Sequence, residues 1–116
     1  APPPDTRAGR KDARILESEF RAESLRLAKQ IKAHAEAKGI STGQFALNWV
    51  LNNRLINSVV VGPRTMQHWQ DYLSALDYAF DAEDEAFIDS LVAPGFSSTP
   101  FFADVKLPPR GRIARG

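Results

Sequence analysis

One run of β-branched residues limits what this chain can fold into, because three valines follow one another from Val59 to Val61. A short apolar run bounded by polar and turn residues predicts a buried strand, which we place over residues 57–61. Gly62 and Pro63 end it, since glycine permits a sharp turn and proline lacks the N–H that a ladder needs. A lone strand cannot satisfy its own backbone hydrogen bonds, so the fold requires neighbouring strands from elsewhere.

The other predicted elements are helices, because apolar residues recur at helical spacing on both sides of the strand. We predict one helix over 22–38, which Gly39 ends. A second helix begins at Ser41, where Ser41 and Gln44 match a capping box. A third helix follows Thr65, and a fourth follows Asp81. This order of helix, strand and helix indicates an α/β fold in which parallel strands alternate with helices.

The composition is that of an ordinary globular protein: 43% of the 116 residues are hydrophobic and 25% are charged, with a net charge of +1. Such a chain forms one domain at most, and the balanced charge argues against nucleic acid or an acidic membrane as a partner. No apolar run approaches the ~20 residues that span a membrane. Because the sequence has no cysteine, it can form no disulfide and no cysteine-ligated metal site, and it is compatible with a reducing compartment. We expect no metal site and a cytoplasmic location.

We predict a single partial domain over residues 1–116. Residues 1–14 are rich in proline and then in charge, which is typical of a loop or arm. Residues 15–93 hold the helices and the strand. Residues 94–116 are predicted to form a C-terminal loop with a basic tail, where Lys106 and three arginines follow the last acidic residue.

The turn after the predicted strand is suited to an anion. Gly62 allows a tight turn, Arg64 carries a guanidinium, and Thr65 can cap the helix that follows. Free N–H groups and the positive end of the helix attract negative charge, and a guanidinium can grip a phosphate with two hydrogen bonds. The alternative is an ordinary strand-to-helix connection with a solvated arginine.

Four stretches of the chain resemble the C-terminal part of aldo-keto reductases, in particular bacterial members related to the potassium-channel β-subunit branch. They are residues 27–39, 41–51, 58–65 with the Gly-Pro-Arg-Thr turn, and 68–76. The family folds as a (β/α)8 TIM-type barrel, typically of ~250 residues. The resemblance implies that this chain holds the eighth barrel strand, the last helices and the C-terminal loop.

The resemblance also implies an activity. The family reduces small carbonyl compounds by hydride transfer from NADPH, and its catalytic residues lie on earlier strands that this chain lacks. We therefore expect no catalytic residue here, no activity of the segment alone, and a need for the remaining barrel strands in the same or another chain. Phe96, Phe101 and Phe102 lie in the C-terminal loop that shapes substrate access in the family, or they simply pack.

Part of the family's cofactor site carries over to the turn, at the adenosine 2′-phosphate end of NADP(H). Gly62 matches a position where the backbone approaches the cofactor, and Pro63 and Thr65 complete the turn. Arg64 matches a position that faces the 2′-phosphate, where a guanidinium favours NADP over NAD by charge pairing. His68 stands where the family usually has glutamine or arginine.

Three further positions complete the contacts that the resemblance implies. Asp71 matches an acidic position near the adenine amino group. Tyr72 replaces the asparagine that is usual at the adenine edge, so stacking would take the place of hydrogen bonding. Arg7 matches an arginine in the loop after the seventh barrel strand, which folds over the pyrophosphate.

Two other interpretations remain open. Residues 35–50 superficially match the helix-turn-helix of a DNA-binding module, although the second helix carries Phe45 and Trp49 and no lysine or arginine before Arg54. Alternatively, the chain is an inactive truncated remnant that neither reduces carbonyls nor holds the cofactor. An unpaired strand and one-sided helices would then leave apolar patches exposed.

Overall fold

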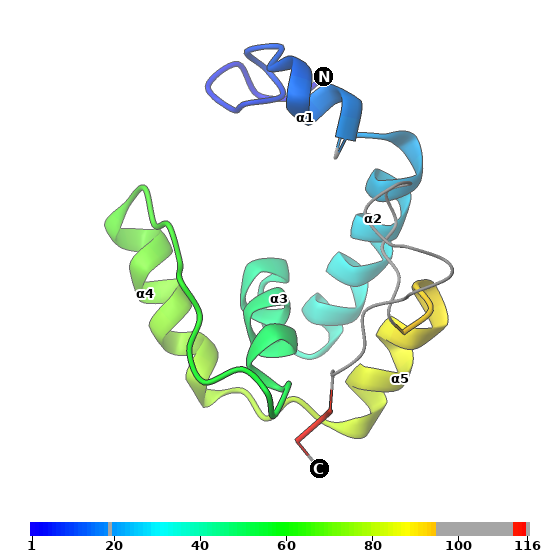
Figure 1. Ribbon diagram of the computed structural model, residues 1–116. Helices are drawn as coiled ribbons and strands as arrows, with labels where there is room; N and C mark the ends of the chain where they lie inside the picture. The colour runs from blue at the N-terminus through cyan, green and yellow to red at the C-terminus, as the bar shows by residue number, and fades with distance from the viewer. Residues whose placement is uncertain (19, 95–112, 116) are drawn as a thin grey trace.

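The computed structural model describes residues 1–18, 20–94 and 113–115, and the regular elements within those ranges are helices (Figure 1). The helices predicted over 22–38 and after Ser41, Thr65 and Asp81 are confirmed. The full order is α1 (Ala13–Ser18), α2 (Ala22–Ala37), α3 (Thr42–Leu51), α4 (Met66–Ser74), the short 3₁₀ helix η1 (Ala75–Asp77) and α5 (Ala82–Leu91).

Helix α3 lies at the centre of the described fold, packed against α2 on one side and against α4 and η1 on the other (Figure 1). Phe45 of α3 is only 1% exposed, and its ring lies against those of His34 and Phe80. Buried apolar residues from the neighbouring helices complete this small core. They are Leu27, Ala35 and Ala75.

Local capping explains where the helices begin and end. Ser41 and Gln44 form the predicted capping box at the start of α3, and the Thr65 hydroxyl accepts a hydrogen bond from the His68 N–H at the start of α4. Gly39 has φ +80°, the left-handed conformation that ends a helix at little cost for glycine, and it stops α2 as the sequence predicts. These features depend only on neighbours within a few residues along the chain.

The strand predicted over 57–61 is not formed within the described residues. Residues 56–63 run as an irregular segment beside α4, from the end of α3 to the start of α4 (Figure 1). No described segment offers this run a ladder of backbone hydrogen bonds, and Val60 is 99% exposed. A β-branched run becomes a strand only when a partner satisfies its N–H and C=O groups, so the local pattern alone was insufficient.

The described residues at the two ends of the chain make local contacts of their own. Residues 1–12 form successive turns, and α1 then begins at Ala13, inside the segment predicted as an arm. At the other end, Ala114 forms an isolated antiparallel bridge with Asn53, and the Arg115 guanidinium donates to the carbonyls of Leu51 and Ile56. The rest of the predicted basic tail, with Phe96, Phe101 and Phe102, lies outside the described residues.

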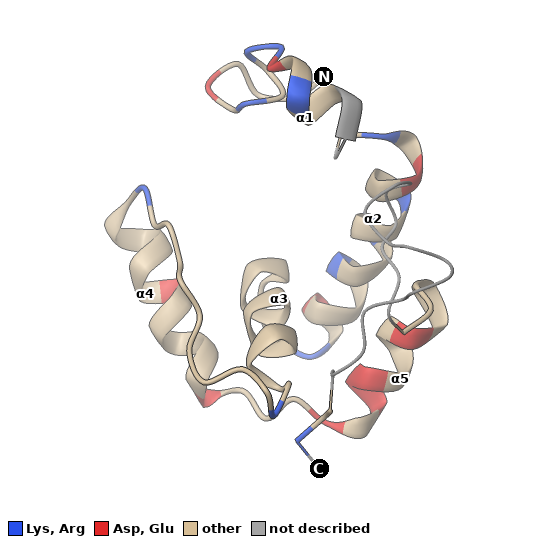
Figure 2. Ribbon diagram, in the orientation of Figure 1, with Lys and Arg blue, Asp and Glu red and all other residues tan. Residues whose placement is uncertain are grey.

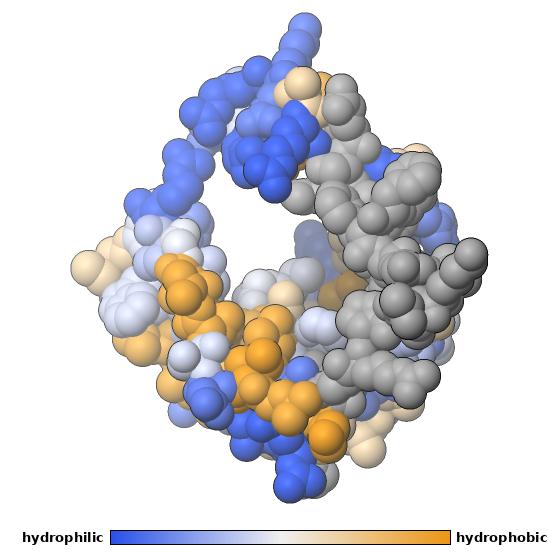
Figure 3. All heavy atoms as spheres, in the orientation of Figure 1, coloured by the Kyte–Doolittle hydropathy of each residue, from blue (hydrophilic) through white to orange (hydrophobic). Residues whose placement is uncertain are grey.

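Large apolar side chains remain exposed on α4 and on the segment before it. Figure 3 shows hydrophobic side chains gathered over these two parts of the molecule. Trp69 and Leu73 of α4 and Leu76 of η1 are 43%, 48% and 66% exposed, so the described residues leave much of each side chain uncovered. The most exposed members of this apolar face are Leu55, Val60, Met66, Trp69, Leu73 and Leu76. Within the described ranges, no helix has the length and apolar character needed to cross a membrane.

Candidate functional site

A pocket of about 240 Å³ lies between the first turn of α3 and one side of α4. One wall is the capped beginning of α3, and the opposite wall consists of side chains that recur along α4 at helical spacing. The lining residues are Ser41, Gly43, Gln44, His68, Asp71 and Tyr72. The pocket thus combines two helices whose facing residues are separated by more than 20 positions in the sequence.

Hydrogen bonds fix both walls of the pocket. Gln44 accepts the Ser41 N–H through Oε1 at 3.0 Å and donates through Nε2 to the Asp71 carbonyl at 3.0 Å. The Asp71 carboxylate accepts a hydrogen bond from Gln67 Nε2 at 2.9 Å, within α4. Asp71 and Tyr72 are half-buried, whereas His68 is exposed at the outer edge.

The turn that leads into α4 lies next to this pocket. The Arg64 N–H donates to Nδ1 of His68 at 3.3 Å, so Nδ1 carries no proton in this arrangement. Among the described residues, no ion pair or hydrogen bond engages the Arg64 guanidinium, and the side chain is exposed. A solvent-facing cation therefore stands at the N-terminal end of α4, where the helix dipole already favours negative charge.

The structure brings together part of the cofactor set that the sequence analysis singled out. His68, Asp71 and Tyr72 line the pocket. Arg64 and Thr65 stand at the start of α4, and Gly62 and Pro63 precede them.

Arg7 lies in the N-terminal turns and is engaged elsewhere. Its guanidinium pairs with the Asp12 carboxylate at 3.1 Å, and this hydrogen bond lowers the pKa of Asp12. No hydrogen bond or ion pair within the described ranges joins Arg7 to the other seven predicted cofactor residues.

Gly62 stands in open space. A Cβ added at this position would meet no heavy atom within 4 Å, so packing within the chain does not require glycine here. A requirement for glycine at this turn would therefore have to come from a ligand or from further protein.

Sequence reasoning found the α4 wall of the pocket but missed the α3 wall. Ser41 and Gln44 were recognised only as a helix cap, and Gly43 was not singled out. The cap is a local signal, whereas its position opposite Asp71 depends on how α3 packs against α4. No pattern within one helix could have revealed that proximity.

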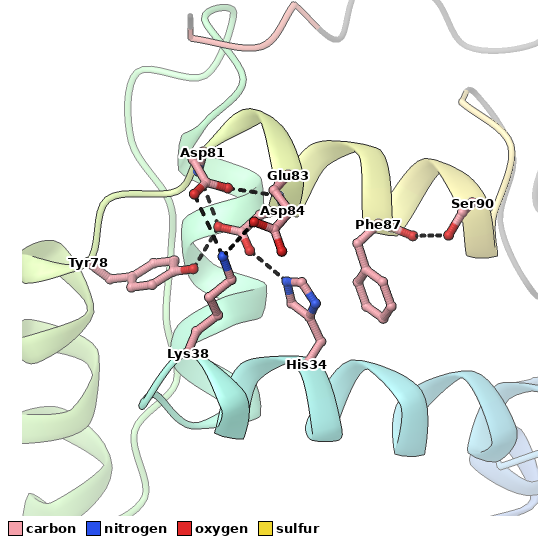
Figure 4. Close-up of polar contacts among 8 residues, drawn as sticks. All are labelled: His34, Lys38, Tyr78, Asp81, Glu83, Asp84, Phe87 and Ser90. Atoms are coloured by element: carbon pink, nitrogen blue, oxygen red, sulfur yellow. Dashed lines mark hydrogen bonds and ion pairs between the residues drawn. The ribbon is translucent and has the colours of Figure 1, made fainter.

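A second polar cluster joins α2 to α5 around the fully buried carboxylate of Asp84 (Figure 4). The Tyr78 hydroxyl donates to Asp84 Oδ2 at 2.6 Å, and His34 Nε2 lies 2.6 Å from Oδ1. The Asp81 N–H also donates to Asp84, and Asp81 accepts the Asp84 N–H in return, which makes a second capping box. Lys38 lies 3.8 Å from the Asp81 carboxylate.

The environment of Asp84 favours its charged form. Burial opposes ionisation, but hydrogen bonds from Tyr78, His34 and the Asp81 backbone, together with Lys38, outweigh it and lower the pKa of Asp84. Burial and the hydrogen bond to Asp84 raise the pKa of Tyr78, so the phenol stays protonated. A hydrogen bond to Glu83 raises the pKa of Lys38.

His34 lies between aromatic rings at this cluster. Its ring stacks on Phe87 with the centroids 4.1 Å apart and meets Phe45 edge-on at 5.3 Å. Together with its hydrogen bond to Asp84, this stacking makes His34 a structural link between α2 and α5. Its partner lies 50 residues along the chain, which no local pattern could indicate.

Charge is unevenly distributed over the described helices. Acidic residues gather on α5, with basic residues on α2 and at the turn before α4 (Figure 2). In the part of the chain that the structure describes, no group of three or more histidine, cysteine or acidic side chains could hold a metal ion. The pocket beside α4 is therefore the site whose residues best suit a ligand.

Comparison with known proteins gives two matches. The family model described as the aldo/keto reductase family matches residues 3–93. The L-glyceraldehyde 3-phosphate reductase of Escherichia coli O157:H7 is 33% identical over 79 residues, which are 67% of this chain and 22% of that protein. The match therefore spans about a fifth of the curated relative's length. No solved structure matches the chain.

Proposed function

The chain belongs to the aldo/keto reductase family, and on that premise we propose that it is the C-terminal segment of an NADPH-dependent carbonyl reductase. Its role is to hold the adenosine 2′-phosphate end of the cofactor. The observation that carries the proposal is the pocket between α3 and α4. The turn next to it carries Arg64, whose exposed guanidinium has no partner among the described residues.

The chemistry of the residues present suits that end of NADPH. A 2′-phosphate needs a cation and N–H donors. Arg64 immediately precedes the N-cap of α4, and its N–H donates to His68, which lines the pocket. An adenine ring needs a flat apolar surface and polar groups at its edge, and Tyr72 and Asp71 supply these types of side chain. Gly62 leaves open space at the turn, so no side chain obstructs an approaching ligand there.

The reaction itself needs groups outside this chain. When bound, NADPH supplies the hydride that reduces a carbonyl carbon. Residues of this chain bind and orient the far end of the cofactor, and none of them is proposed to act on the carbonyl. The substrate class is a small carbonyl compound, in keeping with the aldehyde named for the matched relative.

The exposed apolar face supports the need for more protein. Leu73 of α4, Leu76 of η1 and Val60 before α4 are exposed among the described residues. Soluble monomers rarely leave so many large apolar side chains together in water. We propose that the remaining barrel strands, from the same or another chain, cover this face and pair with residues 57–61.

The test is cofactor binding by the complete protein with Arg64→Ala. We expect NADPH affinity to fall about tenfold to a hundredfold, because charge-assisted hydrogen bonds to the 2′-phosphate are lost. NADH affinity should hardly change, since NADH lacks that phosphate. Arg54→Ala, an exposed arginine before the turn, is the matched control and should leave both affinities unchanged. Equal losses for NADPH and NADH in Arg64→Ala would refute the 2′-phosphate assignment.

A further inference from the structure

Three amide side chains stand four residues apart along α3, at positions 44, 48 and 52, so they follow one side of the helix. Gln44 donates to the Asp71 carbonyl at 3.0 Å, and Asn48 donates to the Ala75 carbonyl at 2.8 Å. Asn52, one turn further on, donates instead to Glu85 of α5 at 2.7 Å. The first two amides therefore reach α4 and η1, and the third reaches a different helix.

The orientation of the first two amides follows from their partners. Asn48 Nδ2 lies within hydrogen-bond distance of two carbonyls, those of Gln44 and Ala75, so the NH₂ group must point there. Gln44 Oε1 accepts the Ser41 N–H, which leaves Nε2 for Asp71. Both groups are thus donors toward α4 and η1.

The two acceptors repeat at the same spacing as the two donors. The carbonyls of Asp71 and Ala75 are four residues apart, like Gln44 and Asn48. Two donors and two acceptors at the same helical spacing can pair fully only in one register. Sliding or rotating α4 against α3 would break both hydrogen bonds and take one of two partners from the Asn48 amide, which is only 7% exposed.

This register determines how the two walls of the pocket face each other. Gln44 lines one wall, and its hydrogen bond ends on the backbone of Asp71, which lines the other. Asn48 does not line the pocket, but it holds the C-terminal end of the same pair of helices. The distance between the two walls of the pocket therefore depends on this amide pair.

We propose that Gln44 and Asn48 are positioning residues for nucleotide binding, which hold α4 at the distance and rotation from α3 that the adenosine end of NADPH requires. The proposal rests on the proposed function, because it concerns the same pocket. Asn48 is the more informative of the two, since any effect on the ligand must act through α4.

Asn52 provides a matched control on the same helix. It has the same side chain, it is also buried, and its amide also donates across a helix pair. Its partner is Glu85 on α5, away from the pocket. A merely structural role for these amides would make Asn48→Leu and Asn52→Leu alike in every measurement.

The experiment compares Asn48→Leu, Gln44→Met and Asn52→Leu in the complete protein. Dissociation constants for NADPH and for 2′,5′-ADP, the KM for NADPH, kcat and the unfolding temperature are measured for each. We expect Asn48→Leu and Gln44→Met to weaken binding of both nucleotides about fivefold to tenfold, with kcat unchanged. Asn52→Leu should lower the unfolding temperature while leaving both dissociation constants unchanged.

The outcomes separate this inference from the function it rests on. A wild-type protein that binds neither nucleotide overturns the proposed function and this inference with it. If the wild type binds, an unchanged affinity in Asn48→Leu, or an equal loss in Asn52→Leu, overturns the inference alone. If Asn48→Leu does not fold, the nucleotide dissociation constants of Gln44→Met are compared with those of Asn52→Leu instead. An unchanged affinity in Gln44→Met, or an equal loss in Asn52→Leu, then overturns the inference.

Discussion

Two polar contacts between helices of the described fold use different chemistry. The amide contact joins α3 to α4 and η1 through Gln44 and Asn48, whose uncharged donors meet backbone carbonyls. The carboxylate contact joins α2 to α5 through the buried Asp84, which accepts hydrogen bonds from Tyr78 and His34 (Figure 4). The amide contact divides the interaction over two independent pairs, whereas the carboxylate contact depends on a single side chain.

This difference predicts different responses to mutation and to pH. Amides do not titrate, so the contact beside the pocket should be independent of pH. A carboxylate that serves several buried donors leaves all of them unpaired when it is lost. The pocket thus lies beside the amide contact, which should respond less to mutation and to pH than the carboxylate contact.

The largest effect is expected for Asp84→Ala. Removing the carboxylate leaves the Tyr78 hydroxyl and the His34 ring without their acceptor, so we expect the free energy of unfolding to fall by about 3 kcal/mol. Urea unfolding of the complete protein measures this. Asp84→Asn keeps the size of the side chain and one acceptor oxygen, so its free energy of unfolding should fall clearly less. Equal losses in the two variants would mean that packing, and not the hydrogen bonds, dominates at this position.

A smaller loss is expected when the pH is lowered. The pKa of Asp84 is held below its ordinary value of 3.8, so the charged form stabilises the folded state above that pH. This stabilisation is lost as the pH falls below about 4 through the folded-state pKa. The difference in unfolding free energy between wild type and Asp84→Asn should therefore shrink between about pH 6 and about pH 2. A constant difference would show that Asp84 is not the titrating group.

Asn48→Leu tests the amide contact in the same way. The buried Ala75 carbonyl accepts hydrogen bonds from Asn48 and from the Tyr78 N–H. The substitution removes the first and leaves the second. We expect a loss of about 1 kcal/mol of unfolding free energy, with the same value at both pH extremes. A loss that varies with pH would contradict the distinction between the two contacts.

The smallest effect is expected for Lys38→Met. Lys38 pairs with Glu83 at 3.2 Å and with Asp81 at 3.8 Å, at the solvent-exposed edge of the carboxylate contact. Ion pairs of this kind contribute little and are screened by salt. Thermal unfolding should therefore show only a slight decrease at low salt and none at high salt. A large decrease would place Lys38 within the buried network around Asp84.

Local patterns predicted the helices well. The capping box at Ser41, the Thr65 cap and the Gly39 stop all appear as expected, because each involves residues within one helical turn. A pattern within one helix identifies Asp84 only as one of the acidic residues in the first turn of α5, where they favour the positive end of the helix. Its links to His34 and Tyr78 could not be inferred, since they depend on how α5 packs against α2.

Three of the six residues that line the pocket were singled out from the sequence. His68, Asp71 and Tyr72 share one side of α4, and helical spacing together with the family resemblance was enough to group them. Gln44 on the facing wall was not grouped with them, because only packing brings α3 opposite α4.

By itself, the sequence determined the helices, their caps and the family to which the chain belongs. Those features rest on contacts between residues close together in the chain, or on motifs matched along it. Tertiary structure alone determined which residues line the pocket, that Asp84 is buried, and that residues 57–61 form no strand among the described residues. Helix pairs and strands need partners that are distant in sequence, and for Val59 to Val61 no described residue provides one.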